Sequence, residues 1–110
     1  MEYVPEKGDV VWLSFDPRLG HEQAGYRPAL VLTPSIYNEK AGTMLCCPIT
    51  SRKKGYPFQI ELEGNPDVSG MIMTDQLTCI DWRARVAKKK GVVGGEVLQE
   101  VQHLLEALLF

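Results

Sequence analysis

Cysteine and histidine are scarce in this 110-residue chain, which has three cysteines and two histidines. Cys46, Cys47 and Cys79 form no C-x-x-C pair, and an odd cysteine count fits neither a disulfide framework nor a zinc site. His21 and His103 are far apart in the sequence and have no companion ligands. We therefore expect no metal and no cofactor. Cys46 and Cys47 lie in an apolar, strand-like run, so we interpret them as buried thiols on opposite faces of a strand.

Long hydrophobic runs and a strong net charge are also missing. No apolar run approaches the roughly 20 residues of a membrane span. The segment after Met1 has no basic stretch followed by an apolar one, as a secretory signal would. We therefore expect a cytoplasmic protein with no membrane partner. The formal charge of −2 argues against a surface coated in positive charge, although the cations are bunched at residues 52–54, 83–85 and 88–90.

The length and the 45% hydrophobic content predict one globular domain spanning residues 1–110. Short runs rich in β-branched and aromatic residues predict strands. Both alternating sets of residues 10–15 carry apolar groups, which suits a small closed barrel, whereas residues 58–63 alternate as a strand with one wet face does. The predicted strands are residues 10–15, 29–33, 43–50, 58–63, 71–73, 77–80 and 83–86, with a helical turn at 36–40 and a surface turn at 88–91. Residues 71–73 and 77–80 form either two short strands or one bent strand.

Beyond Glu96 the pattern changes to that of an amphipathic helix. Its apolar positions recur at helical spacing, and they are Val97, Leu98, Val101, Leu104, Leu105 and Leu108. We expect this helix to pack on the sheet by ordinary core contacts. The predicted fold class is therefore mainly β with a C-terminal helix, an SH3-like small barrel.

The link between the first two predicted strands holds the first candidate site residues. Links of this length inside a compact domain are uncommon and often functional. Pro28 biases Arg27 towards extended backbone, so Arg27 is expected at the lip of a strand. With Glu22 it forms either an acid–base and anion-binding pair or an ordinary exposed ion pair of little energetic value.

A second candidate region follows the strand at 43–50. Pro48 cannot donate to a β-ladder, so this end of the strand is expected at a sheet edge or a bulge. Thr50 and Ser51 would then lie where the chain leaves the sheet. Arg52, Lys53 and Lys54 follow directly, and they form either a path for a nucleic-acid strand or a solvated charged loop.

These residue types meet the needs of metal-free RNA cleavage. The ribose 2′-OH must lose a proton, the leaving 5′-oxygen must gain one, and the charge on the phosphoryl oxygens must meet fixed donors. Arg27 can donate two N–H groups to a phosphate, and Thr50 can donate its hydroxyl. Glu22 can accept the proton or hold Arg27 in place. The candidate catalytic residues are thus Arg27, Thr50 and Glu22.

Substrate binding calls for stacking faces and polar groups near these residues. The candidate aromatic residues are Trp12, Phe15, Tyr26 and Tyr56. Trp12 is more often a core residue, whereas Phe15 and Tyr26 lie near loop ends and are as readily stacking faces as core residues. Gln76 can read a base edge, with Asp75 beside it as a possible turn cap. The candidate substrate-binding residues are Phe15, Gln23, Gly25, Tyr26, Ser51, Lys53, Lys54 and Gln76.

Ten short segments together resemble the MazF (PemK-like) toxins of bacterial toxin–antitoxin pairs. Any one of them is weak, but together they span nearly the whole chain in the family's order. They are GDVVW at 8–12, FDP at 15–17, EQAG at 22–25, RPALVL at 27–32, YN at 37–38, CPIT at 47–50, KGYPF at 54–58, DQ at 75–76, WRAR at 82–85 and KKG at 89–91.

The resemblance implies an SH3-like dimeric ribonuclease that cuts single-stranded mRNA without metal and stops translation. The products would be a 2′,3′-cyclic phosphate and a 5′-OH, and the disordered C-terminal segment of a MazE-like antitoxin would cover the groove. By position, Arg27 and Thr50 match the family's principal catalytic pair, and Glu22 matches an acidic residue of one branch. Tyr26 replaces an expected histidine, and Leu77 stands where a polar or basic residue is expected. An ACA-like recognition site is the corresponding guess.

Two other functions use the same class of fold. One is a non-catalytic toxin resembling CcdB, which poisons gyrase by binding and needs no arginine–threonine phosphate site. The other is a plain RNA- or peptide-binding barrel. Arg27 next to a long loop and Thr50 at a strand exit favour the enzyme over the first alternative.

Overall fold

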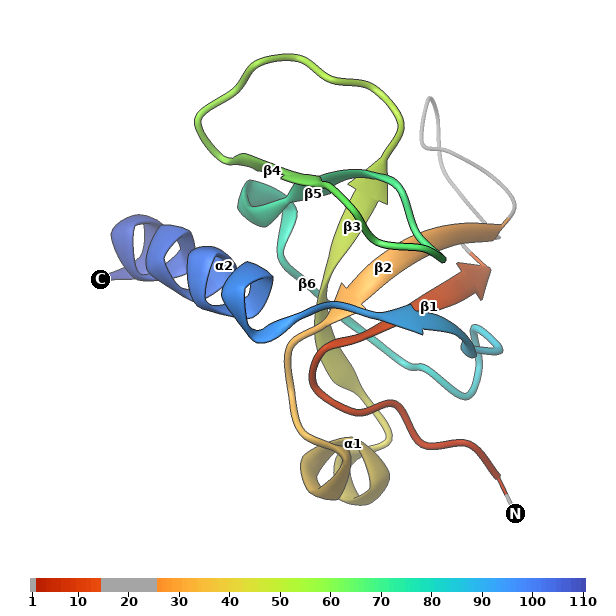
Figure 1. The fold of residues 1–110 in the computed structure, drawn as a ribbon. Helices are drawn as coiled ribbons and strands as arrows, with labels where there is room; N and C mark the ends of the chain where they lie inside the picture. Colours follow the sequence, from red (N-terminus) through yellow and green to blue (C-terminus); the bar gives the residue numbers. More distant parts are fainter. Residues whose placement is uncertain (1, 15–25) are drawn as a thin grey trace, which may run out of the picture.

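The computed structural model describes residues 2–14 and 26–110 (Figure 1). Its strands are β1 (Asp9–Ser14), β2 (Tyr26–Val31), β3 (Met44–Thr50), β4 (Gln59–Leu62), β5 (Gly70–Met73), β6 (Thr78–Ile80) and β7 (Lys88–Val92). Its helices are α1 (Ser35–Ala41), the short 3-10 helix η1 (Thr74–Gln76) and α2 (Gly95–Leu109). The prediction of a mainly β fold with a C-terminal helix is confirmed. None of the helices in these two ranges is both long and apolar enough to cross a bilayer.

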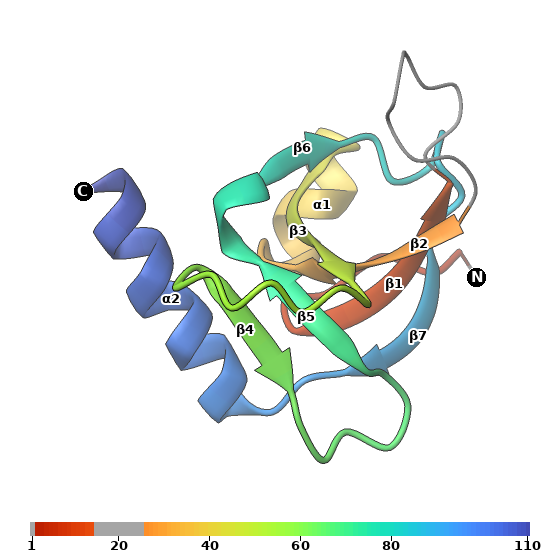
Figure 2. The ribbon, with the colours of Figure 1, turned by 90° about the horizontal axis from the view of Figure 1, so that it is seen from above.

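The strands form one antiparallel, strongly bent sheet in the order β4-β5-β3-β2-β1-β7 (Figure 2). β3 is its central strand and changes partner along its length. Cys46 pairs with both Val31 of β2 and Thr78 of β6, whereas Ile49 and Thr50 pair with β5. Pro48 lies in the interval between the β6-paired and β5-paired residues. The end of β3 is therefore not a sheet edge, one of the two alternatives expected there, although the ladder is irregular beside Pro48. A missing N–H is tolerated because the ladder on that side is already interrupted.

Alternate side chains along the strands enter two separate cores, one on each face of the sheet. Val10, Leu30 and Cys47 belong to the first core, against which the apolar face of α2 packs. Their neighbours along each strand belong to the second core, which also contains Trp82; they are Val11, Val31 and Cys46. The predicted opposite orientation of the two buried cysteines and the docking of the amphipathic helix are both confirmed.

The segment 81–92 differs most from the sequence prediction. Residues 83–86 form a hydrogen-bonded turn, in which the N–H of Ala87 donates to the carbonyl of Trp82 at 2.9 Å. Val86 adopts a φ of 53° there, an unusual conformation for a β-branched residue. The strand instead occupies the lysine-rich stretch Lys88–Val92, which was predicted as a turn. Among the described strands β7 pairs only with β1, and lysines are common on such edge strands because they discourage pairing with another chain.

The second strand also begins earlier than expected. β2 starts at Tyr26, so Arg27 and Pro28 lie within the strand. Arg27 pairs with Leu13 and Pro28 with Trp12 of β1. The arginine is therefore attached to the sheet itself and has a fixed position along it.

Candidate functional site

The register between β2 and β3 relates Arg27 to Thr50. The paired residues are Ala29 with Pro48, Leu30 with Cys47 and Val31 with Cys46. The pairing of β2 with β3 stops at Ala29 and Pro48, and Arg27 and Thr50 each lie two residues beyond this last pair. Side chains alternate between faces, so both residues belong to the face of Ala29 and Cys46, which is that of the second core. Figure 1 shows the start of β2 and the end of β3 diverging at this point, where β3 turns to pair with β5.

Thr50 is held tightly, but its hydroxyl retains a proton to donate. The residue is only 8% exposed. Its Oγ1 accepts a hydrogen bond from the backbone N–H of Arg52 at 3.2 Å. A hydroxyl both accepts and donates, so this contact leaves the O–H group available to a ligand. Behind it, Gly70 has a φ of 129°, and a Cβ there would lie 2.8 Å from the Thr50 carbonyl oxygen. The close contact explains why a glycine occupies position 70.

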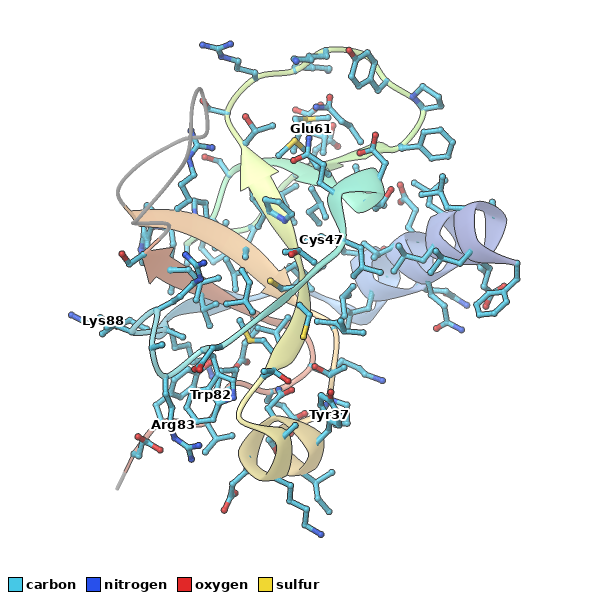
Figure 3. All side chains as sticks on the ribbon, turned by 180° about the vertical axis from the view of Figure 1, so that it is seen from behind. Tyr37, Cys47, Glu61, Trp82, Arg83 and Lys88 are labelled. Carbon is cyan, nitrogen blue, oxygen red and sulfur yellow. The ribbon has the colours of Figure 1, made fainter. Side chains whose placement is uncertain are left out.

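The basic loop at residues 51–57 is exposed throughout. Its cations have different surroundings: Lys53 Nζ lies 2.8 Å from Glu61 Oε1, and Lys54 Nζ lies 5.7 Å from the centre of the Tyr56 ring. The hydrogen bond to Glu61, together with the attraction of its charge, raises the pKa of Lys53. Figure 3 shows Glu61 at the end of the molecule where this loop emerges from β3, far from Trp82 and Arg83.

Arg85 is a candidate that the sequence prediction did not include. Its Nη1 donates to the backbone carbonyl of Ser14 at 3.2 Å, and Ser14 pairs with Tyr26. Burial raises the pKa of the Cys46 thiol to about 12, and the positive charge of Arg85 partly opposes this increase. Arg85 is therefore near the second core and at the end of the sheet where β2 begins. The bunching of cations at residues 83–85 was the available signal, but the strand predicted there gave no reason to expect Arg85 to contact the end of β1.

The other residues discussed in the sequence analysis lie in different parts of the fold. Gln76 is exposed at the end of η1, whose first residue, Thr74, donates its hydroxyl to the carbonyl of Phe58 at 2.7 Å. Leu77 packs against the first core, which accounts for an apolar residue at that position. Lys90 Nζ lies 4.5 Å from the centre of the Trp12 ring, and Trp12 is half-buried within β1. Phe15, Glu22, Gln23 and Gly25 lie outside the described residues, and Tyr26 is described only by its place in β2.

Comparison with known proteins places this arrangement in a family. Residues 6–109 match the model of the PemK-like, MazF-like toxin of type II toxin–antitoxin systems. The chain belongs to this family. It is 49% identical over 107 residues to the endoribonuclease toxin MazF of Escherichia coli K12, covering 97% of this chain and 96% of that protein.

Solved structures agree with the family assignment. A crystal structure of MazF from Deinococcus radiodurans superposes with a TM-score of 0.90 at 48% identity and covers 98% of each chain. A MazE–MazF crystal structure from the same organism gives a TM-score of 0.91, also at 48% identity, covering 98% of this chain and 97% of that chain. The likeness therefore extends over almost the whole PemK/MazF-type domain, including both strands that carry Arg27 and Thr50.

Proposed function

We propose that this protein is an endoribonuclease toxin that cleaves single-stranded mRNA at a short sequence and thereby inhibits translation in the cytoplasm. The observation that carries the proposal is the placement of Arg27 on β2 and Thr50 on β3, each two residues beyond the last pair of these strands and on the same face of the sheet. Membership of the PemK/MazF family and the name of the E. coli relative, an endoribonuclease, support it.

In the proposed reaction the ribose 2′-oxygen attacks the adjacent phosphorus, and the bond to the 5′-oxygen breaks. Arg27 donates two N–H groups to the phosphoryl oxygens as their charge grows, and its planar fork suits this geometry. Thr50 donates its hydroxyl to the same group. Glu22 accepts the 2′-OH proton, and a proton is returned to the 5′-oxygen. The products are a 2′,3′-cyclic phosphate and a 5′-OH, and no step uses a metal ion.

Binding of the RNA strand is assigned to groups around this pair. Lys53, Lys54 and Ser51 would line its path, while Gln76 would contact a base edge; Phe15, Gln23, Gly25 and Tyr26 would contribute from the link before β2. The exposure of the basic loop and of Gln76 is compatible with this role. The recognised motif is proposed to be ACA-like, with Tyr26 as the position expected to alter base preference.

The experiment is cleavage of a mixed-sequence RNA by the purified protein in EDTA, followed by mapping of both ends of the products. Cuts at one short motif that leave a cyclic phosphate support the proposal. No cleavage by a folded, inhibitor-free sample contradicts it and favours a binding toxin of the CcdB type. Deoxyribose at the cut position should abolish cleavage while binding persists, because the 2′-OH is the nucleophile.

A MazE-like antitoxin is the proposed protein partner, and a homodimer is the proposed assembly. The solved MazE–MazF complex of D. radiodurans is the comparison that supports the partner. A basic loop that receives RNA phosphates can also receive an acidic peptide. Co-purification of the cognate antitoxin should suppress cleavage, and light scattering should give twice the mass of the chain.

A further inference from the structure

The outer face of β4 holds the basic loop in place by three side-chain contacts. Gln59 Oε1 accepts a hydrogen bond from the backbone N–H of Lys54 at 3.0 Å, and Gln59 Nε2 donates to the carbonyl of Arg52 at 3.4 Å. Two residues further along the same face, Glu61 Oε1 accepts from Lys53 Nζ at 2.8 Å. Ile60 and Leu62 alternate with these residues and point into the first core. The loop therefore folds back along β4, an edge strand whose opposite face is buried in the first core.

Because of these contacts, the three cations of the loop differ in whether a carboxylate neutralises their charge. Lys53 is partnered by a carboxylate, whereas Arg52 and Lys54 form no salt bridge with a carboxylate in residues 2–14 or 26–110. The side chains of Lys53 and Glu61 are 68% and 41% exposed, so an incoming phosphate can reach the ammonium group. Exposed ion pairs of this kind are weak enough to be exchanged for another anion.

We propose that Glu61 sets the affinity of the protein for RNA by occupying Lys53 in the free state. An RNA phosphate must displace the Glu61 carboxylate before Lys53 contributes to binding. Glu61 is thus an affinity-determining residue that touches neither the substrate nor the reacting atoms. This inference rests on the proposed function, because it takes single-stranded RNA as the ligand of the loop.

The test compares Glu61→Gln with the wild-type protein, using an RNA that carries deoxyribose at the cut position so that binding is measured without cleavage. Glutamine retains the size of the side chain and removes its charge. We expect tighter binding by roughly two- to fivefold at low salt, the range of an exposed ion pair. The slope of log K against log salt should steepen by up to about 0.7, the contribution of one additional phosphate contact by single-stranded RNA.

Two further variants separate the effect of the ion pair on RNA affinity from the effect of net charge. Glu39→Gln removes the same charge from an exposed position on α1, at the opposite end of the molecule (Figure 1), and should leave affinity within the error of the wild type. In a Lys53→Gln background, Glu61→Gln should have no further effect, because the lysine that it releases is absent. Equal gains from Glu39→Gln and Glu61→Gln would overturn the proposal, as would a gain from Glu61→Gln that persists without Lys53.

Cleavage kinetics give an independent readout. With cleavable RNA, Glu61→Gln should lower KM while kcat stays the same, because Glu61 does not contact the reacting phosphate. A change in kcat alone would assign Glu61 a structural role at Thr50 and contradict the proposal. Absence of cleavage by the wild type would instead refute the proposed function, while the affinity comparison could still be made on any single-stranded RNA that the protein binds. Failure to bind RNA at all would overturn both.

Discussion

Replacing Thr50 by valine should separate the chemistry of the site from the stability of the fold. Valine has nearly the same shape, so the packing of this 8%-exposed residue is retained while the hydroxyl is lost. The lost hydroxyl no longer accepts the N–H of Arg52, a contact of 3.2 Å. Arg52 is exposed, so water can take over this N–H group, and the free energy of unfolding should fall by only about 0.5–1.5 kcal/mol.

The effect on cleavage should be larger. A hydrogen bond to a charged group contributes about 1.5–3 kcal/mol, and each 1.36 kcal/mol is tenfold in rate. If Thr50 donates to the phosphoryl oxygens in the transition state, the single-turnover rate at saturating RNA should fall by roughly 10- to 150-fold. The assay is cleavage of an oligonucleotide containing the mapped motif, with urea denaturation of the same samples to measure stability.

Thr50→Ser is the matched control, because serine keeps the hydroxyl and loses only a methyl group. It should retain most of the activity even though its packing is poorer. The reasoning is refuted if a folded Thr50→Val variant cleaves within threefold of the wild type. It is also refuted if Thr50→Ser is as inactive as Thr50→Val, since the hydroxyl would then not be the group that matters.

Substitutions at three other positions test the site and the structure that supports it. Arg27→Ala should reduce cleavage by orders of magnitude with little loss of stability. Arg27→Lys should not restore cleavage, because lysine lacks the two-pronged donor geometry of arginine. Normal cleavage by Arg27→Ala would show that the site is misassigned. Gly70→Ala should lower the free energy of unfolding by roughly 2–5 kcal/mol in urea denaturation, because its Cβ would lie 2.8 Å from the Thr50 carbonyl oxygen at a φ of 129°. Val86→Asn should raise the Tm, because asparagine tolerates the φ of 53° better than a β-branched residue does. Val86 is 48% exposed, so the substitution removes little buried apolar surface. A lower Tm would contradict the argument that the backbone is strained at this position.

Local patterns alone were enough to predict much of the fold. The period of two along the strands predicts that Cys46 and Cys47 face opposite cores, and the helical period beyond Glu96 predicts the helix that covers one of them. These predictions succeed because the pattern follows directly from burying one face of each element. The order of short motifs along the chain was likewise sufficient to predict the family.

The lysine-rich strand β7 could not be predicted from local sequence patterns. Lysine is depleted in strands on average, and residues 88–90 therefore resemble a surface turn. The stretch becomes a strand because β1 supplies a hydrogen-bonding edge. Lys88 and Lys89 stay exposed on this outermost strand, whereas Lys90 is half-buried over the Trp12 ring. The preceding turn, closed around the buried Trp82, then directs Arg85 towards the end of β1.

Arg27, Thr50 and Glu22 could be named as candidate catalytic residues from sequence patterns alone, because their side chains can bind a phosphate or accept a proton. Only the three-dimensional structure shows on which strands and on which face of the sheet Arg27 and Thr50 lie. The register of β2 and β3 relates residues that are far apart in the chain, and register is set by the burial of whole strand faces rather than by any local motif. The same holds for Lys53, which resembles its neighbours in the sequence but is distinguished by the carboxylate of Glu61 on the next strand.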